Sequence, residues 1–264
     1  MVKGLYTAYT GMVNEQHRLN VLSNNLANAD TNGYKKEGTT SQTFADELAV
    51  KIKDSSYYKM PQRLGGMSMG VHIGETYTDY SAGNYRVTDN ATDFALKGDG
   101  FFAISYTDKA GNSSVKYTRD GAFTINTQGY LVTKDGDFVL NQNDAMAGNV
   151  NGRIRVNPNE KITVDELGNI FQNGQQITTI GHVDFTDYNY LAKFGENLYD
   201  MVEGGTIVAS DAQVSQGLIE SSNVNVVSEM VNMITISRAY QAGQKVINAV
   251  DETLEKAVNQ VGQV

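Results

Sequence analysis

The chain begins with a helical repeat of apolar positions. Over residues 3–30 they recur three and four apart, which places them on one stripe of a helix. The ladder is interrupted at Glu15 and consists of Leu5, Ala8, Met12, Leu19, Leu22, Leu26 and Ala29. Asn32-Gly33 follows directly. Because this pair readily adopts a left-handed conformation, it predicts the end of the helix.

Residues 225–258 carry the same pattern for longer, on two stripes. The first has heptad spacing and contains Val226, Met230, Met233, Tyr240, Ile247, Leu254 and Val258, with polar residues at Ser237, Gln244 and Asp251. The second is rich in alanine and contains Val227, Val231, Ile234, Ala239, Ala242, Val246, Ala249 and Ala257. Two stripes indicate a helix that is contacted from more than one side. Periodicity leaves open an ordinary C-terminal helix that docks on its own domain.

Between about residues 71 and 205 the pattern changes to short apolar runs of β type. They lie at 94–96, 101–104, 122–125, 130–132, 138–140, 162–164, 177–180 and 183–185. Gly-rich turn signals such as Gly98-Asp99-Gly100 and Asn173-Gly174 separate them. Such spacing predicts an all-β sandwich or barrel-like domain. The predicted fold class is therefore α+β, with paired, coiled-coil-like N- and C-terminal helices that flank an inserted all-β domain.

This pattern predicts four regions. Residues 1–33 and 225–264 form a terminal helical module, residues 34–70 an extended connector, residues 71–210 the β domain and residues 211–224 a return linker. Within the connector, residues 44–52 could form a short helix. Because helical ends flank the β domain, the two termini must come together in space.

Composition narrows the function classes. The 264 residues are 40% hydrophobic, carry a formal charge of −9 and have a pI of about 4.8. A packed core is therefore expected, and the acidic balance argues against nucleic-acid binding and against a polybasic membrane contact. There is no cysteine, which excludes disulfides and thiolate chemistry. We expect neither an ordinary signal peptide nor a membrane-inserted helix, because no apolar stretch is long enough.

One motif could carry catalysis. Gly66-Met67-Ser68-Met69-Gly70 has the spacing of a nucleophile elbow. An elbow needs a strand before it and a helix after it, whereas Val71-His72-Ile73-Gly74 favours a strand. The histidines, His17, His72 and His182, offer no evident partner. Neither histidines nor aspartates have metal-ligand spacing. We therefore expect no catalytic, cofactor-binding or metal-binding residue, and no cofactor.

Asparagines crowd the end of the first predicted helix. Asn24, Asn25 and Asn28 lie in the stretch from Ser23 to Gly33. Each interior Asn costs roughly 0.5 kcal/mol of helix propensity relative to Ala. A frayed helix end is one interpretation. The other is that the amides bond to a packed neighbour and set its register, as polar groups do in coiled coils.

At these asparagines the sequence resembles the bacterial flagellar rod and hook proteins, and the resemblance covers nearly the whole chain. The N-terminal signature runs from Leu19 to Asn28 and through Gly33-Tyr34-Lys35. The β-domain motifs are Gly98–Phe102, Tyr117–Phe123, Gly129–Thr133 and Phe194–Tyr199, and the C-terminal motifs are Gln216–Val227, Glu229–Ile234 and Arg238–Tyr240.

The resemblance implies an axial protein that polymerises helically into a torque-transmitting tube, with the terminal helices as the polymerisation module. Its implied partners are copies of itself, other rod and hook proteins, the flagellar export apparatus and a rod-assembly cap. Its implied location is the flagellar basal body, outside the cytoplasm after type III export. Length, a single β domain and the segment Asn223–Val227 favour the distal rod. The proximal rod stays open, and the hook protein normally carries more β structure.

We expect self-assembly to use the terminal helices. The candidate residues are Leu5, Met12, Leu19, Leu22, Asn24, Asn25, Leu26, Asn28, Val226, Met230, Met233, Ile234, Tyr240, Ile247 and Leu254. The rival class is a β-sheet hydrolase or carbohydrate-binding module with a helical stalk.

Overall fold

The computed structural model describes residues 2–44, 47–51, 62–68, 70–195 and 197–261. The chain divides into two compact units. We call them the helical unit, composed of Met1–Ala27, Glu37–Asp79 and Asn225–Val264, and the β unit, composed of Asn28–Lys36 and Tyr80–Val224. The predicted fold class is confirmed, because terminal helices that pack together flank a β region of several sheets.

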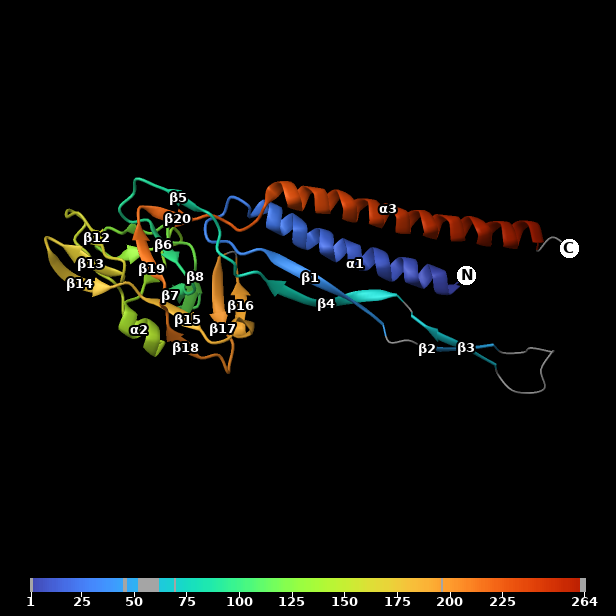
Figure 1. Cartoon of the computed structure of the whole chain (residues 1–264), viewed down its shortest axis with the longest axis horizontal. Helices are drawn as coiled ribbons and strands as arrows, with labels where there is room; N and C mark the ends of the chain where they lie inside the picture. The colour runs from blue at the N-terminus through green and yellow to red at the C-terminus, as the bar shows by residue number, and fades with distance from the viewer. Residues whose placement is uncertain (1, 45–46, 52–61, 69, 196, 262–264) are drawn as a thin grey trace. The chain divides into compact units, whose positions relative to one another are not determined.

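The helical unit is built on two long helices, α1 (Val2–Ala27) and α3 (Val226–Lys256). They lie side by side with the two chain termini at the same end of the pair (Figure 1). Asn225 caps α3, because its side chain accepts a hydrogen bond from the Ser228 amide. A short π-helical turn, η2 (Ala257–Val261), continues α3. Both terminal helices are therefore present as the periodicity predicted.

Two antiparallel strand pairs complete the helical unit. Strand β1 (Glu37–Thr43) pairs antiparallel with β4 (Val71–Thr78), and β2 (Glu47–Lys51) pairs with β3 (Gln62–Met67). The β1–β4 pair lies against α1. Strands therefore occupy much of the segment expected to be an extended connector, and residues 47–51 form a strand where a short helix was considered. Residues 45, 46 and 52 of that possible helix lie outside the described residues.

Two buried asparagines hold β1 on α1. The Asn25 side chain donates to the Glu37 carbonyl at 2.8 Å and accepts from the Glu37 amide at 3.0 Å. Asn14, three turns earlier, exchanges hydrogen bonds with the Ser41 hydroxyl. Asn25 is 0% exposed and Asn14 is 3% exposed. An amide on this face therefore acts as a strand partner, offering one donor and one acceptor to the backbone of β1.

The β unit has a nine-stranded antiparallel sheet as its largest part. Its main path follows the order β16–β17–β8–β7–β11–β10–β9, and β15 pairs with both β7 and β18. The strand bounds are β7 (Phe101–Thr107), β8 (Ser113–Thr118), β9 (Thr124–Ile125), β10 (Leu131–Val132), β11 (Phe138–Val139), β15 (His182–Phe185), β16 (Leu191–Phe194), β17 (Leu198–Met201) and β18 (Ile207–Ala209).

Smaller sheets surround it. One is the three-stranded sheet of β12 (Thr163–Val164), β13 (Asn169–Gln172) and β14 (Gln175–Thr179). Two are strand pairs that join distant parts of the chain: β5 (Tyr85–Val87) with β20 (Leu218–Glu220), and β6 (Phe94–Lys97) with β19 (Gln213–Gln216). Two short helices, α2 (Gln142–Ala147) and the 3-10 turn η1 (Tyr188–Tyr190), complete the unit.

Strand β7 is buried on both faces, which explains its continuous apolar sequence. Phe102 packs into one hydrophobic cluster with Phe94 and Phe123, whereas Phe101 packs into a second cluster with Phe185 and Tyr199. Burial also raises the pKa of Tyr117, a member of the second cluster, to about 12. The direction of this shift reflects the cost of placing a charged phenolate in the apolar cluster.

We predict that Asn25→Ala destabilises the helical unit by about 2 kcal/mol, because it removes two hydrogen bonds from a buried site. Asn20→Ala is the matched control, since Asn20 is exposed on the same helix. Amide exchange at Glu37 and the helical melting curve measure the effect. Equal behaviour of the two variants would contradict the role given to Asn25.

Candidate assembly interface

One face of α1 is directed inward. The ladder residues Leu5, Ala8, Met12, Leu19, Leu22 and Leu26 are all half-buried, and so is Glu15, which pairs with Arg18 at 3.1 Å. The polar interruption of the ladder is therefore half-buried and forms an ion pair within its own helix. Tyr6 and Tyr9 point away from this face and are each 58% exposed.

The residues on the inward face of α3 are spaced three and four apart. Ile236 is 4% exposed, and it is flanked along the helix by half-buried Met233, Tyr240, Gly243, Ile247 and Val250. Met233, Tyr240 and Ile247 belong to the first predicted stripe. Ile236, Gly243 and Val250 were absent from it, although each falls three or four residues from a predicted member.

Gly243 lies at a close contact between the two helices. A Cβ placed there would lie 2.7 Å from Met12 Cγ and 3.7 Å from the Ala8 carbonyl oxygen. The glycine therefore allows the two helices to pack here, because the absence of a side chain leaves room for Met12. Periodicity could not reveal it, because glycine carries no apolar signal.

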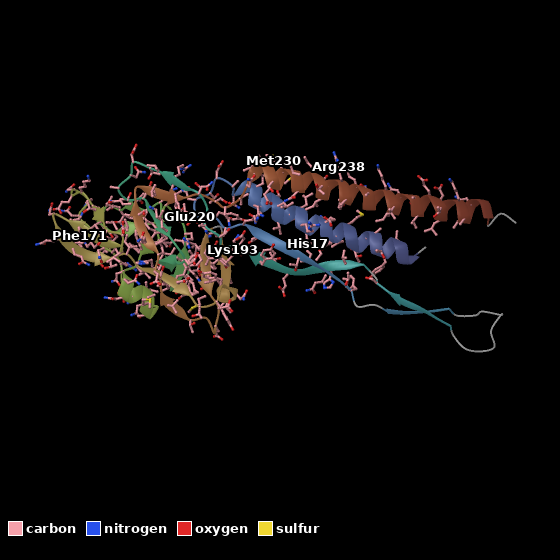
Figure 2. The ribbon with its side chains drawn as sticks, viewed as in Figure 1. His17, Phe171, Lys193, Glu220, Met230 and Arg238 are labelled. Carbon is pink, nitrogen blue, oxygen red and sulfur yellow. The ribbon has the colours of Figure 1, made fainter. Side chains whose placement is uncertain are left out.

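The opposite face of α3 is apolar and open. Val227 is 72% exposed, Val231 57% and Ile234 55%. Val226, Met230 and Val246 are also exposed large apolar side chains, and Leu254, two heptads after Tyr240, is exposed near the C-terminal end of the helix. Figure 2 labels Met230 and Arg238 along this helix and His17 on α1. Exposed apolar stripes of this kind are typical of interaction surfaces.

The C-terminal part of α3 extends past the beginning of α1. Gly243 lies opposite Met12 and Ala8 in an antiparallel pair, and both helices rise equally per residue. Residues after about 251 therefore have no α1 residue opposite them. Consistent with this, Val258 is 72% exposed although its position continues the first stripe.

The asparagine cluster has mixed roles. Asn25 is used within its own unit, as described above. Asn28 lies past the end of α1, where its side chain accepts from the Thr31 hydroxyl at 3.2 Å. Asn14 was missed in the sequence, because it lies outside the crowded stretch. Its signal is its position, eleven residues before Asn25 on the same helical face.

The nucleophile-elbow motif leads into a strand. Met69 lies outside the described residues, and Ser68 bonds only locally, to Gly70. Strand β4 follows, so the strand–turn–helix context of an elbow is missing. In the described part of the chain, acidic and histidine side chains form no group suited to a metal ion, and no helix has the length and hydropathy of a membrane span.

Three family descriptions match successive parts of the sequence. Residues 5–35 match "Flagella basal body rod protein", residues 95–177 match "Flagellar hook protein FlgE/F/G D1 domain" and residues 215–261 match "Flagellar basal body rod FlgEFG protein C-terminal". The flagellar basal-body rod protein FlgG of Bacillus subtilis is 32% identical, over 98% of this chain and 99% of its own length. The chain belongs to the flagellar basal-body rod protein family.

Other rod proteins show the same extent of similarity. FlgG of Buchnera aphidicola from Schizaphis graminum is 32% identical over 97% of this chain and 98% of its own length. FlgF of Caulobacter vibrioides is 31% identical over the full length of both chains. The family resemblance inferred from the motifs is confirmed, and the protein is a structural, non-enzymatic rod subunit of the flagellar basal body. The hydrolase and carbohydrate-binding alternatives are therefore wrong.

The rod family's two terminal signatures coincide with the candidate interface. The N-terminal match covers most of α1, and the C-terminal match covers all of α3 together with β20. Rod proteins of this family assemble with other rod and hook subunits. The exposed stripe of α3 is thus located in a segment that defines the family.

We predict that two glycine substitutions in the helices differ in effect. Gly11→Ala should stabilise the helical unit by up to about 1 kcal/mol, because a Cβ there meets nothing within 4 Å and alanine favours the helix. Gly243→Ala gains the same propensity but must displace Met12, so we expect its net effect to be about 1 kcal/mol less favourable. Helical melting curves provide the comparison, and equal stabilisation would refute the close approach.

Proposed function

We propose that this rod subunit polymerises with copies of itself into a helical tube, using its terminal helices as the inner contact layer. The observation that carries the proposal is the exposed apolar stripe Val227, Val231 and Ile234 on α3. The stripe faces away from α1, so a single chain leaves it in water. Covering it with a neighbouring helix gains roughly 25 cal/mol per Å² of apolar surface.

Both helices contribute surface to this proposal. Leu5, Met12, Leu19, Leu22, Leu26, Met233, Tyr240 and Ile247 shape the α1–α3 pair, and Asn25 fixes β1 on it. Val226, Met230, Ile234 and Leu254 are the exposed side chains that a neighbour would cover. Asn24 and Asn28 lie near the end of α1, where they would set register. The overhanging end of α3 supplies further surface for a second subunit.

We further propose the distal rod as the site of this subunit, with the proximal rod as the alternative. Several relatives of nearly equal length are named FlgG, although two others are named FlgF. Export through the flagellar type III apparatus and assembly beneath a rod cap would deliver the subunit outside the cytoplasm. Other rod and hook proteins would meet the two ends of its segment. Electron cryomicroscopy of basal bodies carrying a tagged chain would assign the position.

We predict that Ile234→Glu reduces rod assembly at least tenfold while α3 remains helical. A charge placed on the covered stripe would be buried without a partner in the polymer, but it stays in water in the monomer. Asn232→Glu is the matched control, because it adds the same charge at an exposed polar position of α3 and should change assembly less than twofold. Counting basal bodies by electron microscopy gives the readout, with circular dichroism for helicity.

Deletion of residues 225–264 should abolish assembly and motility but leave the β unit folded, because that unit ends at Val224. Cells that still built rods with the deleted chain, or that swam normally with Ile234→Glu, would disprove the proposal.

A further inference from the structure

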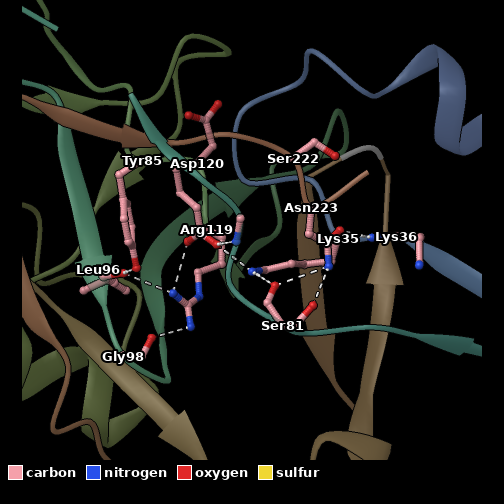
Figure 3. Close-up of polar contacts among 12 residues, drawn as sticks. Lys35, Lys36, Ser81, Tyr85, Leu96, Gly98, Arg119, Asp120, Ser222 and Asn223 are labelled. Atoms are coloured by element: carbon pink, nitrogen blue, oxygen red, sulfur yellow. Dashed lines mark hydrogen bonds and ion pairs between the residues drawn. The ribbon is translucent and has the colours of Figure 1, made fainter. Parts of the chain in front are cut away.

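The β unit contains a buried charge cluster that joins three separate passages of the chain (Figure 3). The Glu220 carboxylate accepts from Lys35 Nζ at 2.7 Å, from the Gly83 amide at 2.9 Å and from Arg119 Nη1 at 3.2 Å. Its backbone carbonyl also accepts from the Gly33 amide at 2.8 Å. These partners lie 185, 137 and 101 residues from Glu220 for Lys35, Gly83 and Arg119.

All three charged side chains are deeply buried. Lys35 and Glu220 are each 1% exposed and Arg119 is 3% exposed. Arg119 also donates to the carbonyl oxygens of Leu96 and Gly98, and Lys35 donates to the Ser81 carbonyl. Removing the carboxylate from such a group leaves buried positive charge with neutral acceptors, which is strongly unfavourable.

The strands beside Glu220 also complete the core. Strand β19 pairs with β6 and β20 pairs with β5, and both bring in buried apolar side chains. Val214 and Ala212 belong to the cluster around Phe94 and Phe102, and Ile219 is 3% exposed. Residues 211–220 therefore supply both the last strands and the counter-charge of the unit.

The helical unit shows the same dependence on late sequence. Helix α1 packs on α3, which begins at Val226. An α1 without α3 exposes its half-buried ladder and loses its packing partner. Neither unit can therefore be completed by the first 210 residues.

We propose that Glu220 is the closing latch of the β unit, so that this unit folds only when residues 213–220 dock and bring the carboxylate to Lys35 and Arg119. The β unit then stays open until the chain's final fifth is available. Long-range contacts of this kind must overcome loop-closure entropy before they stabilise anything. For an exported subunit, an application that rests on the proposed function, the latch keeps the β unit open whenever residues 213–220 are not yet available to dock.

The test is amide exchange of full-length Glu220→Gln against Glu203→Gln, an exposed control in the same unit. We expect exchange in β7 and β8, which do not pair with β20, to rise about 100-fold or more in Glu220→Gln. The control should change less than threefold. Loss of protection confined to residues 33–36 and 80–84 would overturn the latch, because it would show a local contact only.

A second measurement on the unmodified chain needs no variant. During refolding from denaturant, pulsed exchange should show residues 80–84 becoming protected in the same kinetic phase as β7 and β8. Protection of β7 and β8 in an earlier phase would overturn the proposal. Neither readout involves assembly, so failure here leaves the rod proposal standing, and failure of assembly leaves the latch standing.

Discussion

The ion cluster of Glu220, Lys35 and Arg119 is the constraint on which the β unit depends. Burying three charges is favourable only when geometry satisfies each of them, and here the carboxylate serves two cations and a backbone amide. The partners come from the segment after α1, from the beginning of the β unit and from its centre. One side chain therefore joins the first passage of the chain through the β unit, which ends at Lys36, to the start of the second passage at Tyr80.

Much of this architecture was predictable because its signals are periodic. The ladder beginning at Leu5 gave α1, and the run beginning at Val226 gave α3 within two residues of its observed ends. Strands such as β7 were predicted because both faces are buried and the sequence is continuously apolar. Strand β8 was missed, since Ser113, Ser114 and Lys116 interrupt its apolar pattern. Helix α2 was also missed, although Asn141 and Gly148 carry its capping chemistry.

The sequence predicted that the terminal helices carry apolar faces, but it did not predict which face each residue would occupy. Periodicity showed two stripes on α3, yet only the structure tells which stripe meets α1. Two residues that contribute to packing in the helical unit give no signal in the sequence. Gly243 has no side chain, and Asn14 occupies an ordinary polar position. The Glu220 cluster could not be predicted from the sequence for a different reason. A lone glutamate at the end of a short strand gives no hint of cations 101 and 185 residues away.

The route of the chain between its units has a mechanical consequence. The backbone passes from one unit to the other four times, after Ala27, Lys36, Asp79 and Val224. A tensile load applied to one unit therefore reaches the other through four backbone connections. Because the four connections share the load, each carries a fraction of the force that a single connection would bear. Within the β unit, the charge cluster joins the ends of three of these connections to one another, near Lys35, Gly83 and Glu220.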